Sequence, residues 1–181
     1  MSTLTPEQAT FILAASLPAL HAEHAVTKSV IAAIPADKAD FRPDQIVRSA
    51  IDLAWHIAAA ETRFLDAVAS GAFDFSGGAR PESIRTPNDV VGWYSERFAK
   101  AVDRLKQMTG DQLIRIIDFR GLFQLPAVSY VDIGLRHAIH HRGQLSMYLR
   151  PMGAKVPSIY GESYDAREAR EKAKSASAEG R

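Results

Sequence analysis

The sequence contains no cysteine among its 181 residues. Disulfides, thiolate-bound metals and cysteine nucleophiles are therefore excluded, and a bound metal would have to use nitrogen and oxygen ligands. The chain also lacks an apolar run of the roughly 20 residues that a membrane-spanning helix needs, so we expect no membrane association. The first seven residues lack the basic and apolar regions of a secretory signal, and we expect a cytoplasmic protein.

Neither sign of charge is in excess. The sequence has 22 Lys and Arg residues against 21 Asp and Glu residues, mixed along the chain. Nucleic-acid binding requires a basic surface that this balance does not supply, so we expect no nucleic-acid partner. Hydrophobic residues make up 46% of the chain and charged residues 24%. These values are typical of a soluble globular domain that is long enough to bury a core.

Four segments show the three- and four-residue spacing of apolar side chains that is typical of helices with one buried face. They cover residues 6–34, 44–70, 87–108 and 126–152. Thr5-Pro6 and Thr86-Pro87 each combine an N-cap residue with proline at the first helical position, and Gly71 marks a helix end. Four such helices bury their apolar faces most simply against one another. The pattern therefore predicts an all-α fold, a four-helix bundle with long connecting loops.

The segments outside these helices are less regular. Residues 71–85 form a long loop, and residues 113–119, which are rich in isoleucine, are expected to be short and extended. Residues 156–161 carry apolar side chains and are expected to pack back on the bundle. The C-terminal composition of Ala, Glu, Lys, Arg and Ser is typical of a solvated helix or a disordered tail. We therefore place the domain at 1–162 and a charged, flexible tail at 163–181.

The last helical segment contains three histidines, His137, His140 and His141. On a helix, His137 and His141 lie about one turn apart and about 40° apart around the axis. Two neutral imidazoles at this spacing can converge on one first-row metal ion. His140 lies about 60° to the other side of His137, so the spacing alone leaves both pairs open as the ligand pair. A third ligand has to come from another segment.

A lone histidine, His56, lies in the second helical segment. Its neighbours on that side of the helix are Ser and Ala residues, which leave space around the imidazole. Metal sites recur in the interior of helical bundles, where facing helices supply ligands from distant parts of the chain. His24 and Thr27 are polar residues on the apolar stripe of the first segment, where a hydrogen-bonded core role is the more common one.

Three stretches together resemble the DinB/YfiT superfamily of four-helix-bundle metalloproteins. They are His56 with the five residues that follow it, the motif His137-x-x-x-His141-Arg142-Gly143-Gln144, and the segment 156–161. The similarity extends over about residues 5–162. It implies a divalent metal, usually zinc or nickel, held by His56, His137 and His141. It also implies that His141, and not His140, completes the pair.

Three histidine ligands would leave at least one coordination position of the metal open, as in catalytic zinc sites. Characterised proteins that this chain resembles are thiol-dependent transferases and isomerases, besides others described as hydrolases. The resemblance thus implies a metal-dependent enzyme that acts on a small-molecule substrate, with a low-molecular-weight thiol as a further cofactor. The alternative is a non-catalytic, stress-associated metal-binding bundle whose purpose is its dimer interface. The resemblance also implies a homodimer.

Several residues near the motif allow more than one interpretation. By resemblance, Glu23 and Thr27 form a polar pair beside the cavity, but an exposed Glu23 and a Thr27 bonded to its own helix fit the sequence equally well. Arg142 is expected to make a charge-assisted contact that holds the end of the helix or a partner subunit. Gly143 is expected to permit a close helix approach. Glu61 is expected at the surface or behind the metal ligands, and no general base can be assigned.

Overall fold

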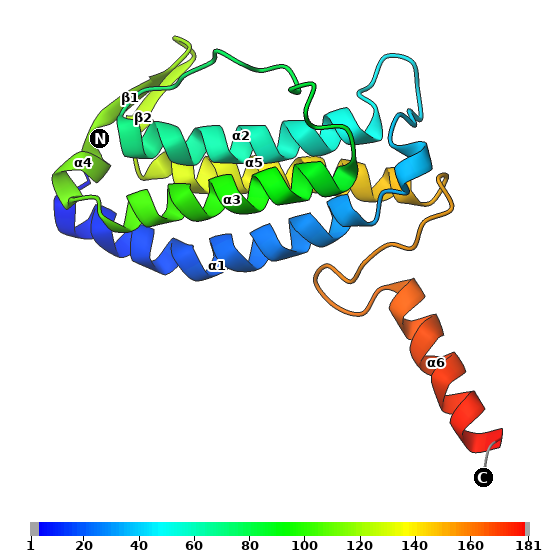
Figure 1. Cartoon of the computed structure of the whole chain (residues 1–181). Helices are drawn as coiled ribbons and strands as arrows, with labels where there is room; N and C mark the ends of the chain where they lie inside the picture. Colours follow the sequence, from blue (N-terminus) through cyan, green and yellow to red (C-terminus); the bar gives the residue numbers. More distant parts are fainter. Residues whose placement is uncertain (1–3, 180–181) are drawn as a thin grey trace.

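The computed structural model describes residues 4–179 and is mostly helical. Four long helices lie side by side (Figure 1). They are α1 (Pro6–Ala32), α2 (Ala50–Ser70), α3 (Pro87–Lys106) and α5 (Ser129–Leu149). Both α1 and α2 pack against α3 and α5, so each long helix has two long neighbours. None of the helices in the described part of the chain combines the length and apolar character that a membrane crossing needs.

The predicted helix starts are confirmed at Thr5 and Thr86. Each threonine side chain accepts a hydrogen bond from a backbone N–H in the first turn, and the residue at that position, Gln8 or Asp89, bonds back to the threonine N–H. This reciprocal arrangement satisfies two backbone donors that a helix start otherwise leaves unpaired. The end of α2 is also as predicted, because Gly71 has a φ of 89°, in the left-handed region that glycine adopts easily.

The predicted start of α2 at residue 44 is wrong. The helix begins at Ala50, with Ser49 as its N-cap. The Asp44 side chain accepts a hydrogen bond from the Ile46 N–H at 2.8 Å, a local turn that competes with helix formation. Ile46 is therefore not on the buried face of a helix but 94% exposed in the preceding loop, which contains the short 3₁₀ helix η1 (Ala36–Lys38).

The region between α3 and α5 departs from an all-α fold. A short helix, α4 (Gly110–Ile114), is followed by the antiparallel strands β1 (Ile116–Phe119) and β2 (Phe123–Pro126). The extended segment predicted at 113–119 is confirmed only for Ile116–Phe119, because Leu113 and Ile114 belong to α4. Neither α4 nor the pairing of Ile116 with Pro126 was predicted. Because Pro126 ends β2, the last long helix begins at Ser129 and not at Pro126.

Helices α2 and α5 approach each other closely at Gly134. A Cβ atom on this residue would lie 2.7 Å from the Cβ of Phe64, so only glycine allows the observed spacing. The expectation that Gly143 has this role is wrong, because a Cβ on Gly143 would meet no described atom within 4 Å. Gly134 precedes His137 by three residues and therefore sets the distance between the helices that carry the candidate ligands.

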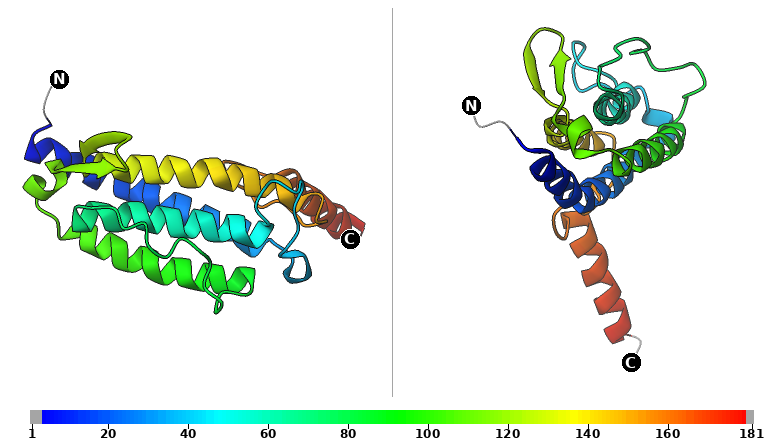
Figure 2. Two further views of the ribbon diagram at one scale, coloured as in Figure 1. Left: turned by 90° about the horizontal axis from the view of Figure 1, so that it is seen from above. Right: turned by 90° about the vertical axis from the view of Figure 1, so that its left-hand side faces the viewer.

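The C-terminal part of the chain leaves the body of the molecule after α5. Val156 and Ile159 pack on the core, as predicted for residues 156–161. The last helix, α6 (Tyr164–Glu179), then points away from the other helices (Figure 2). Its first turn is held by an ion pair between Arg150 and Asp165 at 2.8 Å. The sequence was compatible with either a solvated helix or a disordered tail in this segment, and the structure has a helix.

Candidate metal centre

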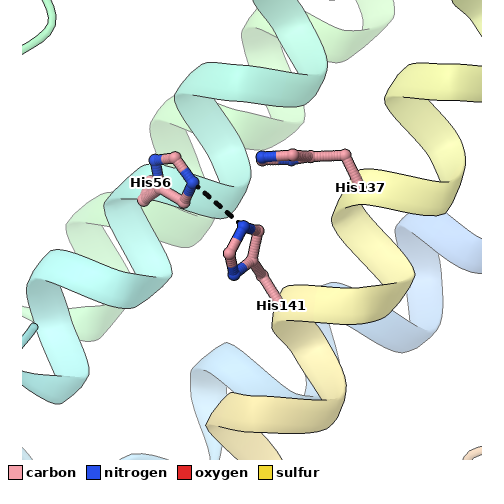
Figure 3. A group of neighbouring side chains, drawn as sticks. All are labelled: His56, His137 and His141. Atoms are coloured by element: carbon pink, nitrogen blue, oxygen red, sulfur yellow. Dashed lines mark hydrogen bonds between the residues drawn. The ribbon is translucent and has the colours of Figure 1, made fainter. Parts of the chain in front are cut away.

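Three histidines from two helices meet in the space between α2 and α5 (Figure 3). His56 comes from α2, and His137 and His141 come from successive turns of α5. One ring nitrogen from each of the three lies within 4.8 Å of the other two. They form the one group of three or more potential metal ligands in the described part of the chain. These are the residues that the sequence and the resemblance selected.

The spacing of the imidazoles fits a shared divalent ion. The Nε2 atoms of His56 and His141 are 3.2 Å apart. Two nitrogens bound to a tetrahedral ion at about 2.0–2.1 Å lie roughly 3.3 Å from each other, which is close to this distance. His137 completes the group from one turn earlier on α5, with its ring centroid 4.4 Å from that of His141. The donor set, three neutral nitrogen ligands, is one that zinc and similar metals accept.

Burial keeps these imidazoles uncharged. It lowers the pKa of His56 and of His137 to about 4, and the positive charge of Arg48 contributes in both cases. The pKa of His141 is also lowered by burial, although its hydrogen bond to Gln144 opposes the shift. At neutral pH the three rings therefore carry lone pairs, the form that binds metal.

The side chain of Gln144 fixes the tautomer of His141. Its Oε1 atom lies 2.7 Å from Nδ1 of His141, so Nδ1 donates a hydrogen and Nε2 faces His56 with a free lone pair. The Gln144 Nε2 atom lies 3.1 Å from Nε2 of His140. His140 therefore contacts Gln144 but is not one of the three histidines of the group. The sequence analysis did not predict this role of Gln144, although its spacing of three residues from His141 and four from His140 on one helix could have indicated it.

One ring nitrogen of His137, Nδ1, is buried without a hydrogen-bond partner among the described residues. Leaving such a group unpaired costs about 1–3 kcal/mol, and buried polar atoms are seldom left in this state.

Behind the histidines, Arg142 joins three parts of the chain. It is 1% exposed, and its Nη1 atom donates to Oε2 of Glu23 on α1 at 2.5 Å. Its Nη2 atom donates to the Tyr160 hydroxyl at 2.6 Å, and Thr27 lies 3.4 Å from Nη1. The predicted charge-assisted contact is thus present within the chain. Glu23 and Thr27 both contact the Arg142 guanidinium. The alternative of an exposed Glu23 and a Thr27 bonded only to its own helix is therefore wrong.

Of the two positions expected for Glu61, the one at the surface is wrong, because its side chain lies in the core. It is 1% exposed and accepts a hydrogen bond from the Tyr94 hydroxyl. Burial raises the pKa of Glu61 to about 8, a shift that Arg142 opposes. Nearby, His24 stacks on Phe98 with ring centroids 3.7 Å apart, and burial lowers its pKa to about 3. His24 does not belong to the group of three histidines.

Two hollows border the centre. The larger, which we call the apolar cleft, has a volume of about 770 Å³ and includes His141 in its wall. Its other main residues are Ile46, Val47, Leu53, Met147 and Tyr148. The smaller, the arginine cleft, has a volume of about 300 Å³ and includes His56. Its charged residues are Arg48, Arg63, Arg80 and Asp52. Arg48 lies in the wall of both clefts. The small residues beside His56 had indicated space next to its imidazole, where the arginine cleft lies, whereas no sequence pattern had indicated the apolar cleft.

The model of the DinB family matches residues 8–173 of the chain, which include all three histidines. The chain belongs to the DinB family. It is 28% identical over 130 residues to the uncharacterized protein YjoA of Bacillus subtilis, a match over 71% of this chain and 82% of YjoA. It is 32% identical over 113 residues to the uncharacterized protein YrdA of the same organism, a match over 60% of this chain and 64% of YrdA.

Solved structures share the fold of this DinB family member. The crystal structure of the DinB-like protein YjoA from Bacillus subtilis superposes with a TM-score of 0.65 at 26% identity, over 77% of this chain and 94% of YjoA. A DinB-like protein from Bacillus cereus superposes with a TM-score of 0.67 over 88% of this chain and all of the other. Its identity of 21% supports the fold alone.

Proposed function

We propose that this DinB family protein is a metal-dependent enzyme whose four long helices form a bundle around a zinc or nickel ion. Its substrate would be a small molecule, and its reaction a thiol-dependent transfer or a hydrolysis. His56, His137 and His141 would hold the ion. A divalent ion held there would supply Lewis-acid chemistry, polarising a carbonyl group or lowering the pKa of a bound water or thiol.

The observation that supports this proposal is the combination of three neutral imidazoles with two adjoining clefts. A structural zinc site is closed by four protein ligands, whereas a catalytic site keeps a position open. In the described part of the chain no fourth histidine or carboxylate joins the group. The clefts beside His141 and His56 give a small molecule room to approach.

The residues of the chain would have distinct parts in this reaction. His56, His137 and His141 would present their lone pairs, and Gln144 would hold the His141 ring in one tautomer. The apolar cleft would hold apolar parts of a substrate or a thiol. We assign no proton-transfer role, since within residues 4–179 the Glu61 side chain forms no hydrogen bond or ion pair with the three histidines and is buried against Tyr94.

The alternative function, a non-catalytic metal-binding dimer, predicts a closed site and gives no role to the clefts. The open arrangement therefore favours the enzyme. A homodimer and a cytoplasmic location are part of both proposals.

The proposal is tested first by measuring the metal in the purified, untagged protein by mass spectrometry. We expect about one zinc or nickel ion per chain. His56→Ala, His137→Ala and His141→Ala should each lose the metal. His140→Ala is the matched control, because it removes a neighbouring imidazole from the same helix and should keep the metal. Full metal content in the His137 variant would refute the ligand assignment.

The thiol is tested on a cobalt-substituted sample, to which glutathione, bacillithiol or mycothiol is added. A new absorbance band from a thiolate bound to cobalt would support thiol transfer. Metal without any such band would favour hydrolysis. A wild-type protein that contains no metal and takes up none would refute the proposed function.

A further inference from the structure

The arginine cleft carries an excess of positive charge next to His56. Arg48, Arg63 and Arg80 lie in its wall, and Asp52 is its one acidic residue. Three arginines against one aspartate leave two positive charges. A divalent ion on the three histidines would increase this positive potential further, since low-dielectric walls concentrate the field of the charges around them.

The charges in this cleft are not equally available to a ligand. The Asp52 carboxylate lies 3.0 Å from Nε of Arg80 and 3.8 Å from a nitrogen of Arg42. Arg80 also donates to the backbone carbonyl of Ile84 at 2.5 Å, so its guanidinium is already engaged. Asp52 and Arg80 therefore form part of the wall and do not define the binding groups.

Arg48 and Arg63, in contrast, have free donors. Neither side chain forms a hydrogen bond or an ion pair with any residue in the described part of the chain. Arg63 lies seven residues after His56, about two helical turns along the same face of α2, and its guanidinium is 5.9 Å from the ring centre of Phe75. Arg48 precedes the N-cap of α2 and borders both clefts. The two arginines thus flank the ligand His56.

From this arrangement we infer that the substrate carries an anionic group, a carboxylate or a phosphate, which Arg48 and Arg63 bind beside the metal centre. This inference rests on the proposed function and specifies its substrate class. A guanidinium presents paired N–H donors that match the oxygens of both kinds of anion. The anion would hold the molecule in the arginine cleft with its reactive group toward the histidines. Apolar parts of the same molecule would lie along Trp55, which also lines this cleft.

The test uses the full-length protein as purified, with its metal content recorded. Benzoate, phenylphosphonate and the neutral, similarly shaped benzamide are titrated into the isotope-labelled protein, and affinities are taken from NMR chemical-shift changes. We expect both anions to bind more tightly than benzamide. Arg48→Gln and Arg63→Gln should each lower the affinity for the anions about tenfold and leave that for benzamide unchanged. Arg63→Lys, which keeps the charge, should lose less.

Arg167→Gln is the matched control, because it removes the same charge from α6, outside both clefts. It should leave all three affinities unchanged, and thermal unfolding should confirm that each variant is folded. Tighter binding of phenylphosphonate would indicate a phosphate substrate, and tighter binding of benzoate a carboxylate. Equal affinity for benzoate and benzamide, full anion affinity in both glutamine variants, or no anion binding would overturn the inference. Anion binding by a protein that cannot hold metal would instead refute the proposed function alone.

Discussion

The two glycines of α5 should respond in opposite ways to replacement by alanine. Gly134 is buried against α2, where the added Cβ would lie 2.7 Å from the Cβ of Phe64. Gly143 is on the exposed side of the same helix, and its added Cβ would meet no described atom within 4 Å. The same chemical change thus tests the approach of α2 to α5 in one case and helix propensity alone in the other.

The expected magnitudes follow from these distances. Alanine is favoured over glycine in a helix interior by about 1 kcal/mol, which Gly143→Ala should gain in full. In Gly134→Ala the two carbons have to separate by roughly 1 Å to reach ordinary contact, and such overpacking costs about 1–3 kcal/mol. The free energies of unfolding of the two variants should therefore differ by about 1–3 kcal/mol, with Gly143→Ala the more stable.

Thermal and urea unfolding measure this difference, and the melting temperatures of the two variants should differ by several degrees, at about 2–4 °C per kcal/mol for a chain of this size. Metal affinity is the second readout. Metal sites tolerate ligand displacements of about 0.2 Å, so Gly134→Ala should weaken metal binding while Gly143→Ala leaves it unchanged. A Gly134→Ala protein as stable as Gly143→Ala would refute the reasoning about packing. A destabilised variant with full metal affinity would refute the link between helix spacing and the centre.

Three further predictions concern polar residues around the centre. Gln144→Leu removes the acceptor that holds His141 and should weaken metal binding about 10- to 100-fold in a chelator competition, whereas unchanged affinity would show that the hydrogen bond is dispensable. Burial raises the pKa of Glu61 from 4.5 to about 8, so the folded protein keeps a proton that the unfolded chain releases. The contribution of protonated Glu61 to the free energy of unfolding is complete below the pKa of 4.5 in the unfolded chain and is lost as the pH rises toward 8. Urea unfolding at several pH values should therefore show a smaller loss of stability with rising pH in Glu61→Gln than in the wild type, and parallel pH profiles would contradict this. Arg142→Met leaves the Glu23 carboxylate without its buried partner and should lower the free energy of unfolding by about 3 kcal/mol in urea, while a loss below about 1 kcal/mol would show that the pair contributes little.

Local sequence signals predicted the helix ends that depend on short-range hydrogen bonds. The starts at Thr5 and Thr86 and the end at Gly71 were correct, because caps are made by residues within one turn of each other. The start of α2 was missed, because an apolar residue at the right spacing, Ile46, suggested a longer helix. The turn at Asp44 and the cap at Ser49 are equally local, but apolar periodicity outweighed them in the prediction.

The sequence by itself determined the mostly helical character of this protein and the candidate histidines. The spacing of His137 and His141 is a property of one helix, and the small neighbours of His56 made it a candidate. The resemblance to a known superfamily selected these three and placed His140 outside the set. Only the tertiary structure decided which residues meet around them. Glu61 is buried, Gly134 allows the close helix approach, and the arginine cleft forms beside His56. These features depend on contacts between segments far apart in the chain, whose distances no local pattern encodes.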